Sequence, residues 1–595
     1  MKSLFKINVV FFCVLITSTF LTAEGERSPL LSVTANPTID TPFNRNKGSG
    51  PRYWIAYEYC WINNKPIPEN LWKNNIDWVA DKFKLYGYDM ISNDGWIENA
   101  QTVNTNGYIT RYNDEWVNGF AYWADYIKKK GMKVGYYYNP MWLTKAAFNQ
   151  DLAVKGTGYH TKDIVGGVSF NSELYWVDVA KPGAKEWIQG YVNYFIDLGA
   201  TYLRIDFLEN YEKNYGIVKY AQALQWIKEA AGERILLSLV MPNCYNHGQT
   251  ELRFGDMIRI DDDCFNGGWD FVSDRKRGTW QQHWPQYGNA FDGFVSFADI
   301  GGRGQLILDG DFIRLNTLAN DTERKFKVSL FVMAGSPITI ADQYNTIGNS
   351  ALIYQNKELL DLNDQGFVGK PISYDTRDGY NSSRWIGQLP NGDWIVGLFN
   401  RESSTSNSSI NFAKELGMPA GVSVNVRDLW SHTEISKTDG AYSAELAAHD
   451  CRILRIKNSM LPKYEAEVAS MIGGAKKNTD QKNYSGPGFV DKFESPGAKV
   501  LYAVSVALDG KYKLKAAYAN ASGTGRTASI YINNKKSPGQ LNMSNLASWD
   551  TWGMADKIIS LKAGVNYIAI QYDPGDNGMF NLDYIQVVPT GSAQE

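Results

Sequence analysis

The chain has 595 residues, a formal net charge of −3 and 44% hydrophobic residues. This length predicts two to four domains, and the near-neutral charge argues against nucleic acid or an anionic membrane surface as the main partner. The aromatic fraction is 14%, with 19 Trp and 36 Tyr. Aromatic rings pack either in a large core or against the apolar faces of sugars, and the composition alone leaves both open.

The first 23 residues have the features of a secretory signal peptide. Two lysines precede an apolar run from Val9 to Leu21, and the small residue Ala23 stands at a suitable cleavage site. This run is shorter than a comfortable membrane span, and no other segment is long and apolar enough to be one. We therefore expect a secreted or periplasmic protein with no membrane span in the mature chain, and a polar linker over 24–50.

Residues 51–345 alternate between helical and strand patterns. Helical spacing over 70–87, 116–131, 184–199 and 217–232 is followed each time by a strand pattern, over 88–94, 132–140, 200–207 and 234–242. Such alternation predicts a parallel sheet. The predicted strands end in polar or aromatic residues, and no glycine-rich phosphate motif follows the first one. This combination favours a (β/α)8 TIM barrel, with its site at the carboxyl ends of the strands, over a doubly wound sheet.

The rest of the chain reads as all-β. Short strands separated by turns over 346–458 predict an antiparallel β-sandwich domain, and a second all-β unit over 464–590 is interpreted as a β jelly-roll module. The expected fold class is therefore a multidomain chain of barrel, sandwich and jelly roll. Four cysteines follow the signal peptide without metal-site spacing, and the sequence leaves open whether any of them form disulfides: Cys60, Cys244, Cys264 and Cys451.

Two aspartates at predicted strand ends suit glycoside hydrolysis, which uses a pair of carboxyl groups. Asp206 ends "YLRIDF", where burial beside Arg204 is expected to keep the carboxylate ionised. Asp263 ends a run of three aspartates, whose mutual repulsion raises a pKa as a general acid requires. Strand alternation places Asp261 and Asp263 on one face and Asp262 on the other. The alternatives are a structural salt bridge for the first site, and a helix cap or calcium loop for the second.

Four motifs in this order resemble glycoside hydrolase family 27 and its clan D. They are "YDMISNDGW" (88–96), "YLRIDF" (202–207), "RIDDD" (259–263) and "SLFVMAGSPITIADQ" (329–343). The resemblance covers about 50–455 and implies that Asp206 is the nucleophile and Asp263 the general acid/base of a retaining enzyme. Asp256 is a rival for the acid.

The same resemblance implies a set of residues that bind sugar hydroxyls or form the wall of the subsite. They are Trp54, Asn93, Asp94, Trp96, Arg204 and Arg259. The chain departs from the α-galactosidases of the family in three places. Their Trp-Asn-Asp-Pro-Asp signature is absent, and "GGRGQLILDGD" (301–311) stands near its place. The first acid of the early pair is Asn93, and residues 238–246 contain no acid where those enzymes contact the 2-substituent of the sugar. These departures argue against galactose specificity.

The C-terminal module resembles carbohydrate-binding module family 35, because "YEAE" (464–467) and "NLDYI" (581–585) are similar to that family's first and last strands. The resemblance implies a structural calcium ion, since carboxylate oxygens are suitable ligands. The implied ligands are Glu465, Glu467 and Asp583. The implied sugar contacts are Trp549, Trp552 and Asn577, with core packing as the alternative for the tryptophans.

Barrel, sandwich and module in this order resemble bacterial isomalto-dextranases of family 27, which release isomaltose from dextran. The resemblance implies a secreted retaining α-glycoside hydrolase that acts on a poly- or oligosaccharide and needs no catalytic cofactor. Two alternatives stay open. One is an α-galactosidase or β-L-arabinopyranosidase of the same family, and the other is a non-catalytic carbohydrate-binding protein.

Overall fold

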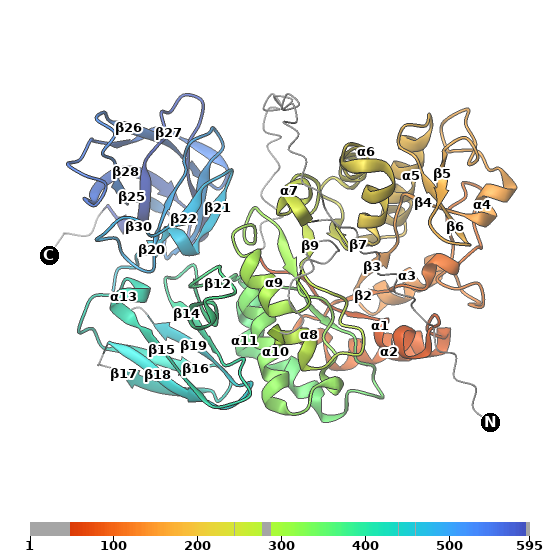
Figure 1. Ribbon diagram of the computed structural model, residues 1–595, viewed down its shortest axis with the longest axis horizontal. Coiled ribbons are helices and arrows are strands. Elements are labelled where there is room, and N and C mark those ends of the chain that lie inside the picture. The colour runs from red at the N-terminus through yellow and green to blue at the C-terminus, as the bar shows by residue number, and fades with distance from the viewer. Residues whose placement is uncertain (1–47, 243, 276–286, 438–439, 458–459, 591–595) are drawn as a thin grey trace, which may run out of the picture. The chain divides into compact units, whose positions relative to one another are not determined.

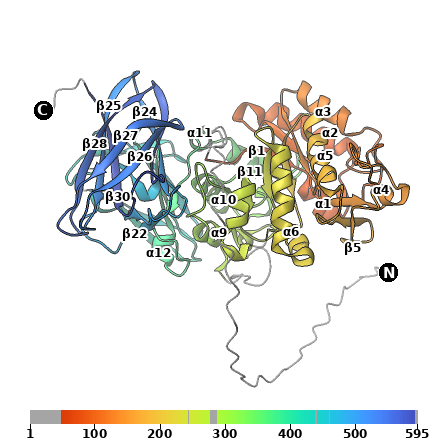
Figure 2. The ribbon, with the colours of Figure 1, turned by 90° about the horizontal axis from the view of Figure 1, so that it is seen from above.

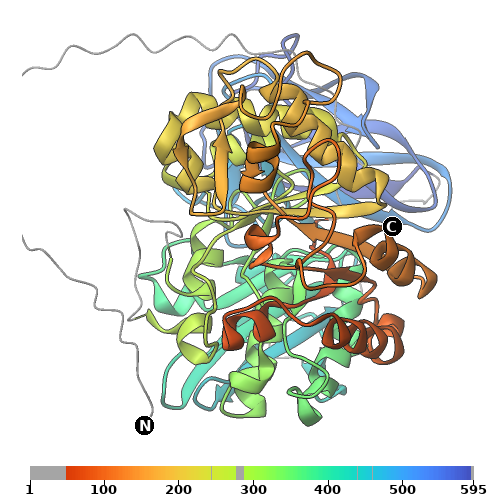
Figure 3. The same ribbon diagram turned by 90° about the vertical axis from the view of Figure 1, so that its right-hand side faces the viewer.

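The computed structural model describes residues 48–242, 244–275, 287–437, 440–457 and 460–590. The predicted signal peptide and nearly all of the predicted 24–50 linker lie outside these residues. The chain runs from an α/β domain, coloured red to green, into two β domains, coloured teal to blue (Figures 1, 2 and 3). Within the described residues, no helix combines the length and apolar character that a membrane crossing requires.

Eight parallel strands form the sheet of the first domain, in the order β10-β9-β8-β7-β3-β2-β1-β11. Their bounds are β1 (Arg52–Ile55), β2 (Met90–Ser92), β3 (Lys133–Tyr137), β7 (Ala200–Ile205), β8 (Leu236–Leu239), β9 (Met257–Arg259), β10 (Ile307–Asp309) and β11 (Ile338–Ile340). Just beyond β10, Ile313 forms a parallel bridge with Ile340 and closes the ring. The predicted TIM barrel is confirmed.

Amphipathic helices cover the outside of the strands (Figure 2). In α3 (Phe120–Lys129), for example, Phe120, Trp123 and Ile127 are buried, at the three- and four-residue spacing of one helix face. The other helices of this domain are α1 (Tyr57–Asn63), α2 (Glu69–Lys82), α5 (Ala184–Asp197), α6 (Leu208–Ala231), α7 (Gln249–Phe254), α8 (Trp269–Ser273), α9 (Ala290–Ser296) and α10 (Asp321–Ala334). Helix α6 begins before the predicted 217–232 segment, and its two parts meet at a kink at Gly216, where φ is 82°.

A small unit that the sequence did not predict is inserted between β3 and α5. It consists of β4 (Trp142–Thr144), α4 (Lys145–Gln150), β5 (Val165–Ser169) and β6 (Leu174–Val177), with an antiparallel sheet in the order β4-β6-β5 (Figure 1). Its Trp142 and Phe170 lie with ring centroids 6.0 and 4.7 Å from that of Phe207. Because Phe207 follows β7, the insertion packs against the carboxyl end of a barrel strand.

The second domain is an antiparallel β-sandwich, as predicted. A six-stranded sheet in the order β12-β13-β14-β19-β16-β17 is accompanied by the pair β15-β18. The bounds are β12 (Lys370–Pro371), β13 (Arg384–Gln388), β14 (Trp394–Phe399), β15 (Ser406–Asn411), β16 (Val424–Asp428), β17 (Thr433–Lys437), β18 (Ala441–Leu446) and β19 (Cys451–Lys457). The helical segments η7 (Gly348–Gln355) and α11 (Lys357–Asp364) precede its first strand.

The C-terminal module is a jelly roll of two antiparallel sheets, β22-β23-β30-β25-β28, with β20 on β30, and β21-β24-β29-β26-β27. The bounds are β20 (Tyr464–Glu465), β21 (Ser470–Ile472), β22 (Lys476–Asn478), β23 (Phe489–Asp491), β24 (Lys499–Val506), β25 (Gly510–Ala519), β26 (Arg526–Ile532), β27 (Lys535–Met543), β28 (Gly553–Leu561), β29 (Gly564–Gln571) and β30 (Asn581–Pro589). The sheets enclose a separate apolar core that includes Leu514, Ile530 and Ile568.

Candidate active site

The predicted catalytic aspartates follow two parallel strands of the barrel. Asp206 comes directly after β7, and Asp263 comes four residues after the last residue of β9. Parallel strands place their carboxyl ends at one face of the barrel. The two carboxylates interact electrostatically, since Asp263 contributes to raising the pKa of Asp206. The structure therefore brings both residues to one site.

The carboxylate of Asp206 is held by two donors. The hydroxyl of Tyr137, at the end of β3, donates to Oδ2 at 2.7 Å, and the Phe207 N–H donates to Oδ1 at 2.6 Å. Burial and then the charge of Asp263 raise the pKa of Asp206, against the lowering effects of Arg204 and of these two hydrogen bonds. The net direction is upward: Arg204 favours the ionised form of Asp206, as expected, but its effect is smaller than those of burial and of the charge of Asp263 together.

Arg204 is paired directly with two acids, Asp309 at the end of β10 and Asp311 two residues beyond it. Its Nη1 lies 3.0 Å from Oδ2 of Asp309, and its Nη2 lies 3.5 Å from Oδ1 of Asp311. Its exposed fraction is 2%. The guanidinium also lies over the ring of Phe312, at 4.8 Å. Arg204 thus organises a buried ionic network below the site, and its predicted contact with sugar hydroxyls stays a prediction.

Asp263 belongs to the same network through a second buried arginine. Arg259 Nη2 lies 2.5 Å from Oδ1 of Asp263, its Nε lies 3.3 Å from Asp261, and its Nη1 lies 2.6 Å from Asp311. Asp261 and Asp263 thus contact one side chain, as strand alternation predicted. About a third of the Asp263 side chain is exposed (34%), whereas Arg259 is fully buried. The Asp263 carboxylate is therefore partly open to the barrel mouth, and the buried Arg259 holds its orientation.

The rival acid Asp256 has a different place. It precedes β9, and therefore lies at the amino end of that strand, opposite the carboxyl ends. Its Oδ1 accepts from Lys228 at 2.8 Å, and its Oδ2 accepts from the Leu237 N–H at 2.9 Å. These contacts give Asp256 a structural role at the other face of the barrel.

Asn93 and Asp94, which follow β2, make different contacts. The amide of Asn93 is used by the backbone of Tyr137: its Oδ1 accepts at 2.9 Å and its Nδ2 donates at 3.3 Å. Asp94 accepts from the Gly95 N–H through Oδ1 at 2.8 Å, while its buried Oδ2 has no hydrogen-bond partner. Burial raises the pKa of Asp94 to about 8. Asn93 therefore ties β2 to β3, and Asp94 presents an unmet acceptor or donor at the site.

The two tryptophans predicted to form the subsite wall differ in exposure. Trp54 has no exposed surface. Its Nε1 donates to the Asp342 oxygen at 2.9 Å, and its ring packs 5.6 Å from Trp72. This core packing argues against a sugar contact by Trp54. Trp96 is partly exposed, donates to Asn64, and has a backbone φ of 65°, a strained value for a residue with a side chain.

Four residues of the site were not predicted as site residues: Tyr57, Glu98, Tyr137 and Asp311. Tyr57 Oη and Glu98 Oε2 are buried without a hydrogen-bond partner. Burial raises the pKa of Glu98 to about 7, with a smaller contribution from Asp206. Asp311 accepts hydrogen bonds from Arg204, Arg259 and the Cys264 N–H. Burial raises its pKa to about 6. The two aspartates of "LDGD" (308–311), separated by one glycine, were the available sequence signal for Asp311.

Three acids gather near the opening strand of the C-terminal module, around Ser485. Ser485 Oγ donates to Glu465 at 2.7 Å, and its N–H lies 3.1 Å from both oxygens of Asp583. At the next residue, a Cβ on Gly486 would lie 2.7 Å from Glu467 Oε1. Burial raises the pKa of Glu465 to about 7 and that of Asp583 to about 9. Glu465, Glu467 and Asp583, which were named from the sequence, are therefore all buried around the 485–486 segment.

The predicted sugar contacts of the module do not form one site. Trp552 lines a pocket of about 280 Å3 with Tyr484 and Asp583, among others, and its Nε1 donates to the Lys482 oxygen. Trp549 is half-buried and is not among the residues that line this pocket. Asn577 bonds through both amide atoms to the 525–527 segment, at 3.0 and 2.7 Å. Its side chain is thus engaged in joining two loops.

The four cysteines that follow the signal peptide, Cys60, Cys244, Cys264 and Cys451, are buried and unpaired. Among the described residues, no group of three or more His, Cys, Asp or Glu side chains is arranged as a metal centre. The barrel site therefore consists of carboxylates, arginines and tyrosines, which suits acid–base and nucleophilic chemistry on a sugar.

Known proteins match the domains in the same order. The alpha galactosidase C-terminal beta sandwich domain matches residues 379–456, and carbohydrate binding module family 6 matches 465–589. The more specific family 35 assignment is therefore not confirmed. An α-galactosidase of Oryza sativa is 22% identical over 69% of this chain and 85% of its own length.

Two further relatives define the relationship. The isomalto-dextranase of Arthrobacter globiformis is 42% identical over 94% of each chain. Its structure in complex with panose has a TM-score of 0.86, covering 92% of this chain and 98% of that one. A family 27 β-L-arabinopyranosidase from Geobacillus stearothermophilus, 18% identical with a TM-score of 0.57 over 69% of this chain and 97% of its own, shows the shared fold. The chain therefore belongs to the isomalto-dextranase family of glycoside hydrolases, with a barrel of the family 27 α-galactosidase type.

Proposed function

We propose that this glycosidase is a retaining α-glucan hydrolase that releases isomaltose from dextran. The identity to the Arthrobacter isomalto-dextranase over nearly the whole chain supports this substrate. The observation that carries the mechanism is the placement of Asp206 and Asp263 at one mouth of the barrel, with separate environments. Asp206 is oriented by Tyr137 and Phe207, while Asp263 is oriented by Arg259 and is partly open.

In the proposed first step, an oxygen of Asp206 attacks the anomeric carbon, and the proton of Asp263 passes to the leaving glycosidic oxygen. A covalent glycosyl ester forms and the leaving alcohol departs. In the second step, Asp263 takes a proton from water, which displaces the ester oxygen and restores both carboxyl groups. Asp94, Tyr57 and Glu98 have buried polar atoms without protein partners. We assign these atoms to the binding of sugar hydroxyls when the substrate enters.

A panel of nitrophenyl α-glycosides together with dextran, with chromatography of the products, tests the substrate. We expect isomaltose from dextran and little hydrolysis of the α-galactoside. Preferred hydrolysis of an α-galactoside or a β-L-arabinopyranoside would instead assign the enzyme to the other activities of its fold. Proton NMR of the fresh reaction tests the mechanism. The α-anomer should appear first, and a β-anomer would make Asp206 a general base.

We also propose that the module binds carbohydrate and is of the family 35 type, with calcium as a structural ion. The pairing of Tyr464 with Ile585 and of Glu465 with Tyr584 places its first and last strands side by side. The buried, mutually repelling carboxylates of Glu465, Glu467 and Asp583 are ligands of the kind that calcium prefers. Unpartnered oxygens on both glutamates support this, although the three groups must draw closer to share an ion. The pocket beside Trp552 is the proposed sugar site.

Export of the enzyme remains part of the proposal. It rests on the apolar run and cleavage site of the first 23 residues. A polymer such as dextran is too large to enter a cell intact, so its hydrolysis requires an exported enzyme. Mass spectrometry of the amino terminus of the mature protein from culture medium or periplasm should begin after Ala23, and retention of the first 23 residues would contradict export by this signal.

A further inference from the structure

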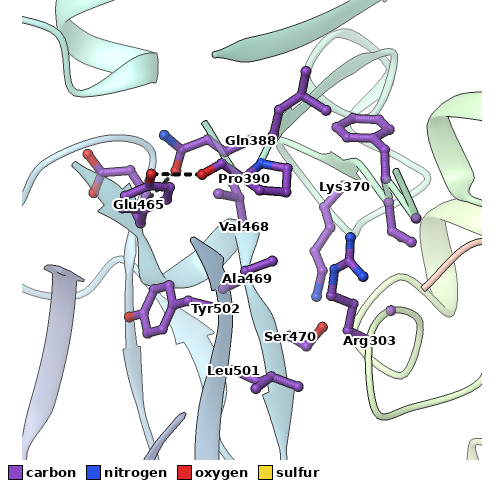
Figure 4. A pocket seen from close by; sticks show the side chains of 17 residues that line it. Arg303, Lys370, Gln388, Pro390, Glu465, Val468, Ala469, Ser470, Leu501 and Tyr502 are labelled. Atoms are coloured by element: carbon purple, nitrogen blue, oxygen red, sulfur yellow. Dashed lines mark hydrogen bonds between the residues drawn. The ribbon is translucent and has the colours of Figure 1, made fainter. Parts of the chain in front are cut away.

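A cavity of about 60 Å3 lies where the three domains meet, away from the barrel mouth (Figure 4). Its lining includes Arg303 from the segment between α9 and β10, Lys370 from β12 and Ser470 from β21. The acid Glu465, from β20, also lines the cavity, on the side away from Lys370 (Figure 4). A single water molecule needs roughly 10–15 Å3 by this measure, so the cavity has room for several waters or for one small ion. Three domains thus each contribute a polar side chain to one cavity.

Lys370 is the unusual member of this lining. Its exposed fraction is 3%, and its Nζ has no hydrogen-bond partner. A buried ammonium without a partner carries a large desolvation cost. Figure 4 shows the Lys370 side chain extending beside Arg303, with the Ser470 hydroxyl nearby. The Lys370 amine is therefore an unmet donor inside the cavity.

The charged groups that face Lys370 from neighbouring elements do not compensate it. Asp299 is the acid that favours its charge, but Asp299 lies 2.7 Å from His247 Nε2. Lys477 opposes the charge, and its own Nζ donates to a backbone oxygen of the sandwich. Arg303 donates to the Gln365 oxygen and lies 3.5 Å from the Tyr567 hydroxyl, both neutral acceptors. Burial lowers the pKa of Lys370 to about 8, so the amine still carries a proton below that pH.

The Ser470 hydroxyl is brought close by a glycine. Gly302 has a φ of 129°, and a Cβ at this position would lie 2.9 Å from Ser470 Oγ. A larger residue would be strained and would push the module away from the barrel. The close approach therefore places a neutral hydrogen-bond donor opposite two cationic groups.

We propose that this cavity binds a small tetrahedral oxyanion, sulfate or phosphate, which bridges Lys370, Arg303 and Ser470 and joins the three domains. Two cations and a hydroxyl supply charge-assisted donors to the oxyanion. The anion in turn gives Lys370 the partner that the protein does not provide. Binding to the folded chain stabilises it by linkage.

The test compares the melting temperature of the full chain in sodium sulfate and in sodium chloride of equal ionic strength, at pH 6.5. Sulfate stabilises most proteins by exclusion from their surface, so the informative quantity is the difference between variants. We expect an extra rise of about 2–4 °C in the wild type and in Lys476→Met, which removes an exposed lysine of the C-terminal module, but not in Lys370→Met. Equal increments in all three proteins would overturn the proposal and leave a hydrated cavity.

Calorimetric titration with sulfate and with phosphate separates the two ions and covers the case in which Lys370→Met does not fold. Ser470→Ala keeps both cations, and we expect it to bind sulfate several-fold more weakly than the wild type. Crystals grown in selenate should show anomalous scattering beside Lys370 Nζ. Binding should also fade at pH 9.5, where the amine loses its proton. No heat of binding at pH 6.5 and no anomalous peak would contradict the site.

Discussion

The barrel mouth and the C-terminal module each hold a cluster of buried acids, but they balance the charge differently. In the barrel, Arg204 and Arg259 are buried among Asp263, Asp309 and Asp311 at 2.5 to 3.5 Å. Every negative charge of this network therefore has a positive neighbour supplied by the chain itself. The arginines hold the acids in fixed positions, which a reaction that depends on geometry requires.

The module places Glu465, Glu467 and Asp583 together without an arginine. Within the described residues, no ion pair includes any of the three. The cations that lower their pKa values are Lys463, which acts on Glu465 and Asp583, and Lys477, which acts on Glu467. Buried acids of this kind take up protons or a metal ion. The barrel acids are thus balanced by arginines of the chain, whereas the module's acids have raised pKa values and no arginine beside them in the part of the chain that the structure describes.

The largest expected effect concerns Asp206, the proposed nucleophile of the barrel site. Replacing Asp206 with Asn should lower hydrolysis of dextran by several orders of magnitude while leaving the melting temperature close to that of the wild type, because an amide cannot form the glycosyl ester. Steady-state kinetics measures the loss. The matched control is Asp125→Asn on the exposed face of α3, which should keep full activity. Near-normal turnover in Asp206→Asn would remove the proposed nucleophile.

Replacing the second catalytic carboxylate, Asp263, should cause a smaller loss of activity that depends on the substrate. Asp263→Asn should reduce turnover of dextran by roughly 10²–10⁴-fold, because the leaving sugar no longer receives a proton. A substrate with a good leaving group, or added azide, should recover part of the activity. Asp256→Asn is the control, since Asp256 pairs with Lys228 at the opposite end of the barrel. Recovery by azide in that variant and not in Asp263→Asn would transfer the acid role to Asp256.

The module half of the comparison predicts a dependence of stability on pH. The pKa is about 7 for Glu465 and about 9 for Asp583 in the folded chain, both raised above the ordinary values. The folded state therefore retains protons that the unfolded state releases, and stability falls as pH rises from about 4 to about 9. Calcium replaces those protons, so its stabilising effect should be larger at pH 8 than at pH 5.5, by a few degrees of melting temperature.

Melting of the full chain with calcium and with chelator at both pH values tests this. Glu467→Gln should melt at a higher temperature than the wild type in chelator at pH 8, because burial raises the pKa of Glu467 and its folding then requires a proton that an amide does not need. The variant should also gain less from calcium. Asp556→Asn on exposed β28 should behave as the wild type. The proposed ion site is wrong if calcium and chelator give the same curve at pH 8.

The comparison also explains how far the sequence could predict the site. Strand ends such as Asp206 and Asp263 were found because alternating helix and strand patterns place all carboxyl ends on one face. Asp311 was missed as a site residue because its role depends on Arg204 and Arg259, which are far away along the chain. Its backbone also has a φ of 69°, a strained value that local propensity does not predict.

The inserted unit at residues 142–177 was missed for a related reason. Its strands are three to five residues long and pair only with each other. They contribute to the site through the contacts of Trp142 and Phe170 with Phe207, which no local pattern indicates. The fold class and the domain order follow from periodicity, but side-chain networks between strands require the structure.

Replacing Tyr137 should have the smallest effect of these variants, because its hydroxyl acts only on the pKa of Asp206. It donates at 2.7 Å to Oδ2 of Asp206 and thereby lowers the pKa of that carboxyl against the effects of burial. Tyr137→Phe should reduce kcat/KM roughly 10-fold, the value of one hydrogen bond to a charged group. It should also move the acidic limb of the pH profile to higher pH, because the unassisted carboxylate takes up a proton more readily. Tyr136→Phe, in the same strand, removes a buried hydroxyl that has no hydrogen-bond partner, and it should change neither the rate nor the limb. An unchanged limb in Tyr137→Phe would mean that Arg204 and the Phe207 N–H set the pKa of Asp206 without the Tyr137 hydroxyl, and Tyr137 would then have no part in the ionisation of the nucleophile.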